Sequence, residues 1–336
     1  MDKLNNSILT KWNNETTQCL GVAPLSPIAL IIHIIIITII QLVITLTNGL
    51  FLIILCDKKT KLSPTCILVL CLTVADLISG FVVLPMITYT RLVTPLYAQW
   101  GMQEDSKETQ RATCFVLLLL GNITYIVSFF IMAAIAFERF IGMKLYKSLN
   151  KTRAKRKVLC GGVLIWVYVA ALCIALFPKS FSYDPVQGCH LTLCVSKPFL
   201  RILRPHLWIP LCLCIVFYIG IYITIVKHRQ IVNIETNGNP MNTLKHIHEE
   251  RWVKTIFWVL VVFYGTWLPY YITNSLITYE ECMAAWKKNI LYSMSTFAFM
   301  SSVANPWIYT YRHTTYRKLL KRKLKRLRKC MKCCKT

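Results

Sequence analysis

Long apolar runs alternate with short polar segments along this chain. Seven such runs cover roughly residues 27–55, 64–89, 112–137, 158–178, 203–226, 252–277 and 289–311. A helix needs about 20 consecutive apolar residues to cross a bilayer, and each run is long enough to do so. The pattern therefore predicts an all-α membrane protein built as a seven-transmembrane helix bundle.

The third run has chemically opposite ends. It begins near Cys114 among polar residues and ends at Glu138 and Arg139, after which further basic residues follow. A charged pair at a membrane boundary is costly unless it has a partner, so this pair is a candidate functional site. We expect the bundle to be organised around this helix.

The placement of charge predicts the topology. The 336-residue chain is 55% hydrophobic and has a net charge of +25. Lys and Arg cluster after the first, third, fifth and seventh runs, which places the N-terminus outside and the C-terminus inside. Basic clusters between apolar runs indicate topology rather than nucleic-acid binding. Asn5 and Asn14 begin glycosylation sequons in the outer segment, where no removable signal is evident.

Five cysteines fall in segments that this topology places outside the cell. An oxidising compartment allows Cys114 to form a disulfide with Cys189 or Cys194, and we favour Cys189. Cys19 and Cys282 could form a second bridge. The sequence alone does not decide between these pairings.

Asp76 lies in the middle of the second run. A lone carboxylate at the bilayer centre needs polar partners or a cation. The candidate polar groups in the other runs are Asn48, Ser128, Ser301, Ser302 and Asn305. Two interpretations stay open, namely a sodium ion bound by oxygens and a hydrogen-bonded network around a protonated Asp76.

Prolines interrupt the fifth, sixth and seventh runs at Pro210, Pro269 and Pro306. Each removes a backbone hydrogen bond and can kink a helix or provide a hinge. Trp267 lies two residues before Pro269, where a bulky aromatic side chain could transmit ligand contact to the bend. Simple filling of the core is the alternative role for this side chain.

Several motifs on these runs resemble those of class A (rhodopsin-like) G protein-coupled receptors. Glu138-Arg139-Phe140 resembles the family's Asp/Glu-Arg-Tyr motif, and Cys114 stands where its bridging cysteine stands. Thr266-Trp267-Leu268-Pro269 resembles its Cys-Trp-x-Pro motif, and 305–309 matches its Asn-Pro-x-x-Tyr motif. Asn48, Asp76, Trp166, Pro210 and Tyr218 match further marker positions.

The resemblance implies an activation switch. Glu138 and Glu249 would hold Arg139 inactive, and activation would free Arg139 towards Tyr218 and Tyr309 as helix 6 moves outward. Ser128 and Ser302 match positions of the family's sodium pocket, which favours a metal ion at Asp76. The implied switch residues are Glu138, Arg139, Tyr218, Glu249, Phe263, Pro306 and Tyr309. The implied sodium site consists of Asp76, Ser128, Ser302 and Asn305. No cofactor is required, and sodium would act as an allosteric modulator.

The resemblance also implies a ligand pocket. Its predicted lining is Gly121, Asn122, Tyr125, His206, Trp267, Tyr270, Tyr271, Asn274, Ser295 and Phe299. Gly121 replaces the ammonium-binding Asp of amine receptors, and Phe299 replaces the retinal-binding Lys of opsins. This aromatic, neutral-polar lining predicts a small, largely uncharged ligand. Asn274 coincides with an Asn of adenosine receptors, so a nucleoside-like ligand is one candidate and a peptide is another.

The C-terminal segment is basic and cysteine-rich. Leucines at 319, 320, 324 and 327 form one apolar stripe among Lys and Arg, which predicts an amphipathic eighth helix on the cytoplasmic leaflet. Cys330, Cys333 and Cys334 are candidate palmitoylation sites. We therefore divide the chain into an extracellular glycosylated N-terminus (1–26), a receptor domain (27–312) and helix 8 with the tail (313–336).

The expected function is that of a plasma-membrane receptor. It would bind an extracellular ligand and activate heterotrimeric G proteins, with arrestin and membrane lipids as further candidate partners and no nucleic acid. A seven-span transporter or channel is the alternative, but only Asp76 is ionisable deep within a run. An enzyme is disfavoured because no nucleophile–base or metal-ligand set is apparent.

Overall fold

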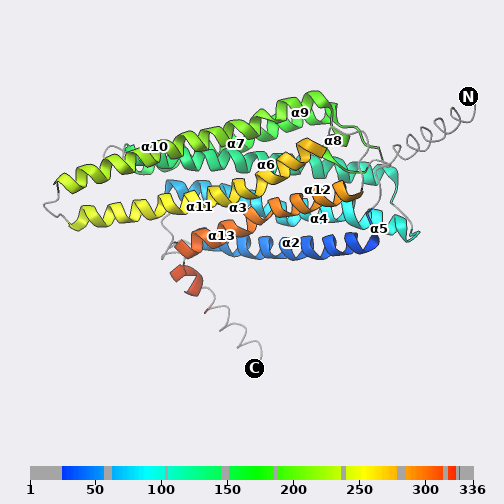
Figure 1. The fold of residues 1–336 in the computed structure, drawn as a ribbon, viewed down its shortest axis with the longest axis horizontal. Helices are drawn as coiled ribbons and strands as arrows, with labels where there is room; N and C mark the ends of the chain where they lie inside the picture. The colour runs from blue at the N-terminus through cyan, green and yellow to red at the C-terminus, as the bar shows by residue number, and fades with distance from the viewer. Residues whose placement is uncertain are drawn as a thin grey trace, which may run out of the picture.

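The computed structural model describes residues 25–56, 63–102, 105–144, 151–184, 188–235, 240–277, 285–312, 317–322 and 325. Within these residues, long helices lie side by side in one bundle (Figure 1). The first span is α2 (Pro27–Leu55), the third is α6 (Lys107–Lys144) and the fourth is α7 (Lys151–Ser180). The fifth is α10 (Pro205–Glu235) after the short α9 (Lys197–Leu203), and the sixth is α11 (Pro240–Ile277). The predicted all-α bundle is confirmed.

Local sequence determines where the first two spans begin. Ser26 and Ser63 are N-caps whose Oγ atoms accept the backbone N–H of Ala29 and Cys66, each at 3.3 Å. A proline follows each cap, where its missing N–H would have had no helical partner. Ser26 and Ser63 therefore fix the residues at which the two helices begin.

The second span is longer than its apolar run predicts. It continues from α3 (Pro64–Ile78) through η1 (Ser79–Val83), α4 (Leu84–Thr88) and η2 (Tyr89–Val93) to α5 (Thr94–Gln99). Each π-helical segment directly precedes an α segment whose second residue is proline, namely Pro85 or Pro95. Wide π turns accommodate the missing N–H without ending the helix, so polar residues beyond 89 remain helical.

The seventh span is divided into α12 (Ala285–Ala298) and α13 (Met300–Arg312). Around Phe299 the backbone N–H groups of Phe299 and Ser302 bond three residues back, at 3.2 and 3.1 Å. Within the described residues, five helices are long and apolar enough to cross a membrane by themselves. They are Pro27–Leu55, Pro64–Gln99, Lys107–Met143, Thr152–Ser180 and Lys197–Val226, and α11 with the α12–α13 pair completes the bundle.

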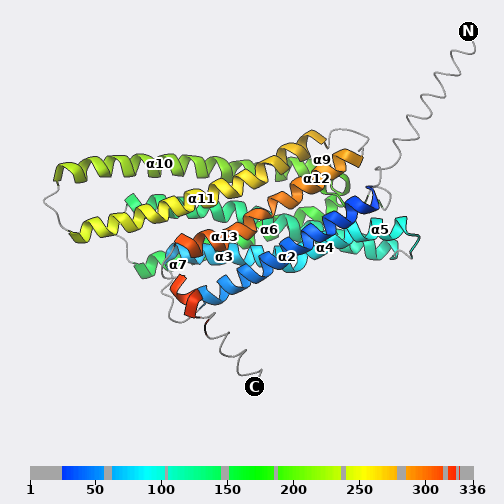
Figure 2. The ribbon, with the colours of Figure 1, turned by 60° about the horizontal axis from the view of Figure 1, so that its bottom comes forward.

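The second and third spans form the centre of the bundle, because they are the most buried of these five. α6 contacts α3, α7, α10 and α11. The outward faces of α2 and α10 expose large apolar side chains such as Ile35, Leu46 and Ile219, as expected for surfaces that face lipid. We call the end with Cys114 and α8 (Leu191–Cys194) the disulfide end, and the opposite end the Glu138 end. Figures 1 and 2 show α10 and α11 extending past the other helices at the Glu138 end.

The predicted amphipathic eighth helix is described only in part. Residues 317–322 are helical, and Leu319 is buried against the core. The sequons at Asn5 and Asn14, the pair Cys19 and Cys282, and the three tail cysteines lie outside the described residues. Glycosylation, the second disulfide, and palmitoylation of Cys330, Cys333 and Cys334 therefore stay predictions.

Candidate functional site

A cavity lies between the second, third, sixth and seventh spans and under α8. Nine of the ten predicted pocket residues line it, namely Gly121, Asn122, Tyr125, Trp267, Tyr270, Tyr271, Asn274, Ser295 and Phe299. The structure thus gathers side chains from three separate spans around one space. The cavity continues down to Asp76, Ser128 and Ser302.

His206 is the predicted pocket residue that does not line the cavity. Its ring stacks on Tyr168 of α7, with centroids 5.9 Å apart, and its Nε2 lies 2.7 Å from the Tyr168 hydroxyl. Its Nδ1 lies 2.8 Å from the Ile202 carbonyl, so that nitrogen donates and Nε2 accepts. Both ring nitrogens are satisfied on the α7 side of α10, and the prediction for His206 is wrong.

Arg91 and Leu191 line the cavity although the sequence interpretation did not include them. Arg91 belongs to η2, beyond the predicted end of the second run. Pro85 and Pro95 were the available signal, because prolines inside membrane helices are tolerated and need not end them. Arg91 adds a positive charge to a lining that was expected to be neutral.

Aromatic rings connect the cavity to the sixth span. Tyr125 stacks on Trp267 with centroids 5.2 Å apart and planes 16° from parallel. Phe129, one turn further along α6, meets Phe263 edge to face at 4.9 Å and Trp267 at 5.9 Å. Offset and edge-to-face pairs of this kind contribute about 0.5–1.5 kcal/mol each beyond burial. Trp267 is therefore packed against rings of both α6 and α11.

Asp76 is buried and accepts two hydrogen bonds from the seventh span. Ser302 donates to one carboxylate oxygen at 2.6 Å and Asn305 to the other at 3.1 Å. Asn48 of α2 donates to the Ser302 carbonyl at 2.9 Å. The second span, the first span and the divided seventh span are thereby joined at mid-membrane.

The residues around Asp76 fit a small hard cation. The Asn305 Oδ1 is buried and has no hydrogen-bond partner among the described residues. The Ser128 hydroxyl uses its proton on the Thr124 carbonyl at 2.9 Å, so its oxygen can still donate lone pairs. Hard cations take such oxygen ligands, whereas among the described residues no cluster of His, Cys, Asp and Glu suits a transition metal.

The Glu138 end holds a bidentate ion pair. Arg139 donates from Nε to Glu138 Oε2 at 2.7 Å and from Nη2 to Oε1 at 3.1 Å. Thr65 of α3 donates to the same Oε2 at 2.7 Å. The two charged side chains are only 17% and 13% exposed, so the pair is far better shielded than a surface salt bridge.

The other predicted switch residues surround this pair in part. Tyr218 lies on α10, where its ring packs against Phe257 of α11 at 5.8 Å, and Tyr309 lies on α13. The Tyr309 hydroxyl is buried without a hydrogen-bond partner among the described residues, while its ring stacks on Phe51 at 6.0 Å. Pro306 is buried and is the seventh residue of α13. The side chain of Glu249 lies outside the described part of the chain.

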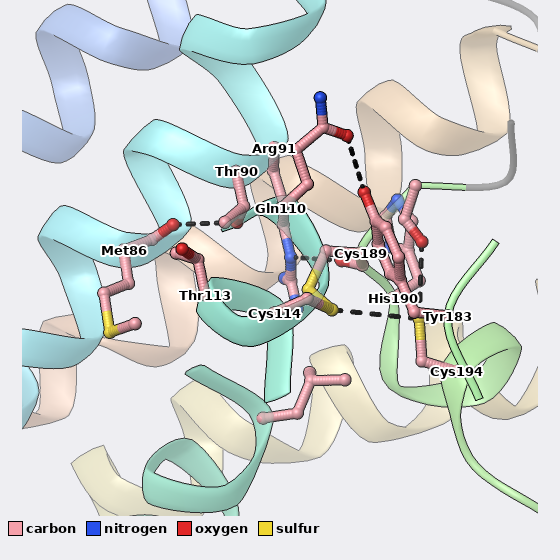
Figure 3. The surroundings of a disulfide bond; sticks show 12 residues. Met86, Thr90, Arg91, Gln110, Thr113, Cys114, Tyr183, Cys189, His190 and Cys194 are labelled. Atoms are coloured by element: carbon pink, nitrogen blue, oxygen red, sulfur yellow. Dashed lines mark hydrogen bonds between the residues drawn. A yellow bond between two sulfur atoms is a disulfide. The ribbon is translucent and has the colours of Figure 1, made fainter. Parts of the chain in front are cut away.

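A disulfide covers the opposite end of the cavity. Cys114 at the start of α6 is bonded to Cys189, as predicted, with Cα atoms 5.6 Å apart (Figure 3). The Cys194 thiol is buried 3.9 Å from the Cys114 sulfur and donates to the Gly188 carbonyl at 3.3 Å. Burial raises the pKa of this thiol. The loop containing α8 is therefore tied down beside Leu191, which lines the cavity.

His190 follows the bridge and is buried as a neutral imidazole. Its Nε2 and the Arg91 carbonyl each lie 3.3 Å from the Tyr292 hydroxyl, and its ring stacks on Tyr292 at 5.6 Å. The Tyr292 proton goes to the carbonyl, so Nε2 of His190 carries a proton and donates. Burial, followed by the charges of Arg91 and Lys288, holds the pKa of His190 well below 6.5.

We expect acid to destabilise the receptor through His190. The unfolded chain binds a proton near pH 6.5 and the folded chain does not, so the free energy of unfolding falls as pH drops below that value. The slope is at most about 1.4 kcal/mol per pH unit. Thermal unfolding of purified receptor between pH 7.5 and 5 measures it. His190→Gln should flatten the profile while His206→Gln keeps it, and an unchanged profile in His190→Gln would contradict the assignment.

Taken together, the spans, the buried polar cluster and the disulfide-capped cavity define a seven-helix membrane receptor. A sequence profile described as 7 transmembrane receptor (rhodopsin family) matches residues 47–309, and the chain belongs to this family. Members are multi-pass plasma-membrane receptors, not enzymes, with an extracellular ligand and a G protein as partners.

Individual relatives are distant. The chain is 25% identical over 273 residues to adenosine receptor A2b of Gallus gallus, which covers 73% of this chain and 74% of that one. It is 24% identical over 290 residues to adenosine receptor A2b of Homo sapiens, covering 77% and 79%. The crystal structure of squid rhodopsin matches 93% of this chain and 92% of its own with a TM-score of 0.70 and 15% identity, which shows the shared fold.

Proposed function

We propose that this receptor binds a small ligand in the cavity from the extracellular side. The bound receptor activates heterotrimeric G proteins when α11 moves outward at the Glu138 end of the bundle. The observation that carries the proposal is the bidentate Glu138–Arg139 pair. It lies on α6, the same helix whose Tyr125 and Phe129 pack against Trp267 and Phe263 at the cavity. In this proposal the disulfide end faces outside and the C-terminus lies inside.

The proposed switch has two packings of one bundle. In the first, Glu138 neutralises Arg139 and the Glu138 end stays closed. Ligand contact with Trp267 shifts Phe263, and Pro269 lets α11 bend because it frees a backbone carbonyl. Arg139 then exchanges its acidic partner for Tyr218 and Tyr309. A ligand shifts this equilibrium only by its difference in affinity for the two packings.

Two ligand classes remain candidates for the cavity. The relatives are named as adenosine receptors, and Asn274 lines the cavity, so a nucleoside is the first small molecule to test. A peptide is the alternative. A transporter or channel is disfavoured. Among the described residues that line the cavity, the charged side chains are Asp76 and Arg91. They are 15 residues apart on one span, or roughly 22 Å, which is too sparse for an ion relay.

A nucleotide-exchange screen tests the function. Cells expressing the receptor are exposed to a panel of nucleosides, small acids, amides and peptides, and exchange is measured on several G proteins. At least one ligand should raise exchange in wild-type cells, and Arg139→Ala should abolish the rise at equal surface expression. Ion flux without exchange on any G protein would overturn the proposal. Recruitment of arrestin and the contact of helix 8 with lipid can be measured in the same cells.

We also propose that sodium binds at Asp76 as an allosteric modulator, with oxygens from Asp76, Ser128, Ser302 and Asn305. Sodium would stabilise the inactive packing, because these residues come from the second, third and seventh spans. At a concentration ten times Kd the stabilisation is about 1.4 kcal/mol. Thermal unfolding in sodium chloride against choline chloride should show it. Asp76→Asn should abolish the difference and Asp105→Asn, an exposed control, should keep it; an equal response in both variants would exclude this site.

A further inference from the structure

The cavity carries a positive charge at its disulfide end. Arg91 is half-buried in the cavity wall, and its Nε donates to the Cys189 carbonyl at 3.0 Å (Figure 3). Cys189 is in turn bonded to Cys114. The guanidinium is therefore fixed by a covalently anchored loop, and its two Nη groups keep four N–H donors for other partners.

Among the described residues, no carboxylate lies within 4 Å of Arg91. The carboxylate that lines the cavity, Asp76, is hydrogen-bonded to Ser302 and Asn305 about 22 Å further along the span. Arginine is rarely buried without a paired charge, because taking a cation out of water is costly. The site therefore lacks a counter-ion in the part of the receptor that the structure describes.

The surroundings of Arg91 reinforce its charge. Lys288 lies 5.9 Å from the Tyr292 ring centroid, next to His190. Arg91 and Lys288 are both close enough to His190 to help burial hold the pKa of its ring down. Tyr270 lines the same cavity as Arg91. An anion entering here is attracted by Arg91 in the cavity wall and, from outside the lining, by Lys288.

We infer that the ligand of this receptor carries a carboxylate, which the two Nη groups of Arg91 bind end-on, and an aromatic body that packs against Trp267 and Tyr270. This inference rests on the proposed function and refines it, since most of the ligand stays uncharged and a single anionic group faces Arg91. A carboxylate matches the paired geometry of two Nη donors, and one guanidinium balances its one charge. The buried hydroxyl of Tyr271, which also lines the cavity, can bind a neutral polar atom of the ligand.

Small carboxylates test the inference without knowledge of the natural ligand or of G-protein coupling. Purified full-length receptor is unfolded thermally in sodium chloride, sodium acetate or sodium benzoate at equal sodium concentration and ionic strength. Benzoate is expected to raise the unfolding temperature most and acetate less. Benzamide, which has the same shape without charge, should bind at least tenfold more weakly than benzoate. Phenyl phosphate tests whether the site prefers a phosphate to a carboxylate, and it should bind more weakly than benzoate.

Matched variants locate the effect. Arg91→Gln should lose benzoate binding roughly 10- to 100-fold, and Arg91→Lys should lose less because it keeps the charge without the fork. Arg111→Gln, at an exposed arginine of the same end on α6, should behave as wild type. If Arg91→Gln does not fold, the wild-type comparison of benzoate with benzamide decides alone. No stabilisation by benzoate, stronger binding of benzamide or phenyl phosphate, or full binding in Arg91→Gln would overturn the inference.

The test also separates this inference from the proposed function. Acid binding at Arg91 without any nucleotide exchange would contradict the signalling role and leave the carboxylate site standing. Nucleotide exchange driven only by neutral ligands, with no benzoate binding, would contradict the carboxylate site and leave the signalling role standing.

Discussion

Replacement of Cys114 by serine should remove most folded receptor from the cell surface. The bridge joins positions 75 residues apart and ties the loop with Leu191 over the cavity. Removing a native disulfide from a folded protein costs about 2–5 kcal/mol, which is a large part of a typical stability. Surface immunolabelling, and thermal unfolding of the purified variant, measure the loss.

The third cysteine makes this prediction sharper. With Cys189→Ser, the Cys194 sulfur still lies 3.9 Å from the Cys114 sulfur and can be oxidised with it during folding. Cys189→Ser should therefore retain more surface receptor than Cys114→Ser, while Cys194→Ser should behave as wild type. The double variant Cys189→Ser/Cys194→Ser should match Cys114→Ser. Wild-type stability of Cys114→Ser would show that the bridge does not stabilise the fold.

The number and order of the spans could be predicted because each leaves a long apolar run in the sequence. A helix in lipid must satisfy its own backbone and be apolar for about 20 residues, and this requirement is visible in any sequence that meets it. The composition of the cavity also followed, because motif positions on α6, α11 and α12 fix which faces point inward. Gly121, Trp267 and Ser295 are examples. The Cys114–Cys189 pairing was favoured but not determined, since Cys194 is equally extracellular in sequence terms and lies close by in the structure.

The remaining features depend on three-dimensional geometry that hydrophobicity does not encode. Arg91 lies beyond the predicted second run because polar residues end that run near 89, yet π-helical turns before Pro85 and Pro95 extend the helix past it. His206 was assigned to the cavity by its position, but Tyr168 and the Ile202 carbonyl satisfy its nitrogens on the other side of α10. The irregular turns of the second span thus placed a charge that changes the predicted ligand.

Glu138→Gln should raise basal nucleotide exchange strongly in the absence of ligand. The glutamine keeps the shape of Glu138 but loses the charge that holds Arg139 through two short hydrogen bonds. Hydrogen bonds between charged groups contribute about 1.5–3 kcal/mol, and this pair is mostly buried, so solvent weakens it little. A change of that size shifts the closed-to-open equilibrium by roughly 10- to 100-fold. Exchange on the coupled G protein, normalised to surface expression, measures the effect.

Thr65→Val provides the graded control, because it removes only the neutral donor to Glu138 at 2.7 Å. Basal exchange should rise in this variant, by less than in Glu138→Gln. Combining Glu138→Gln with Arg139→Ala should return exchange to the level of untransfected cells, since the charge that must reach Tyr218 and Tyr309 is then absent. Equal basal exchange in wild type and Glu138→Gln would mean that the ion pair does not hold the closed packing. A silent double variant beside an active Glu138→Gln would instead place the switch in the guanidinium of Arg139, with Glu138 as its restraint.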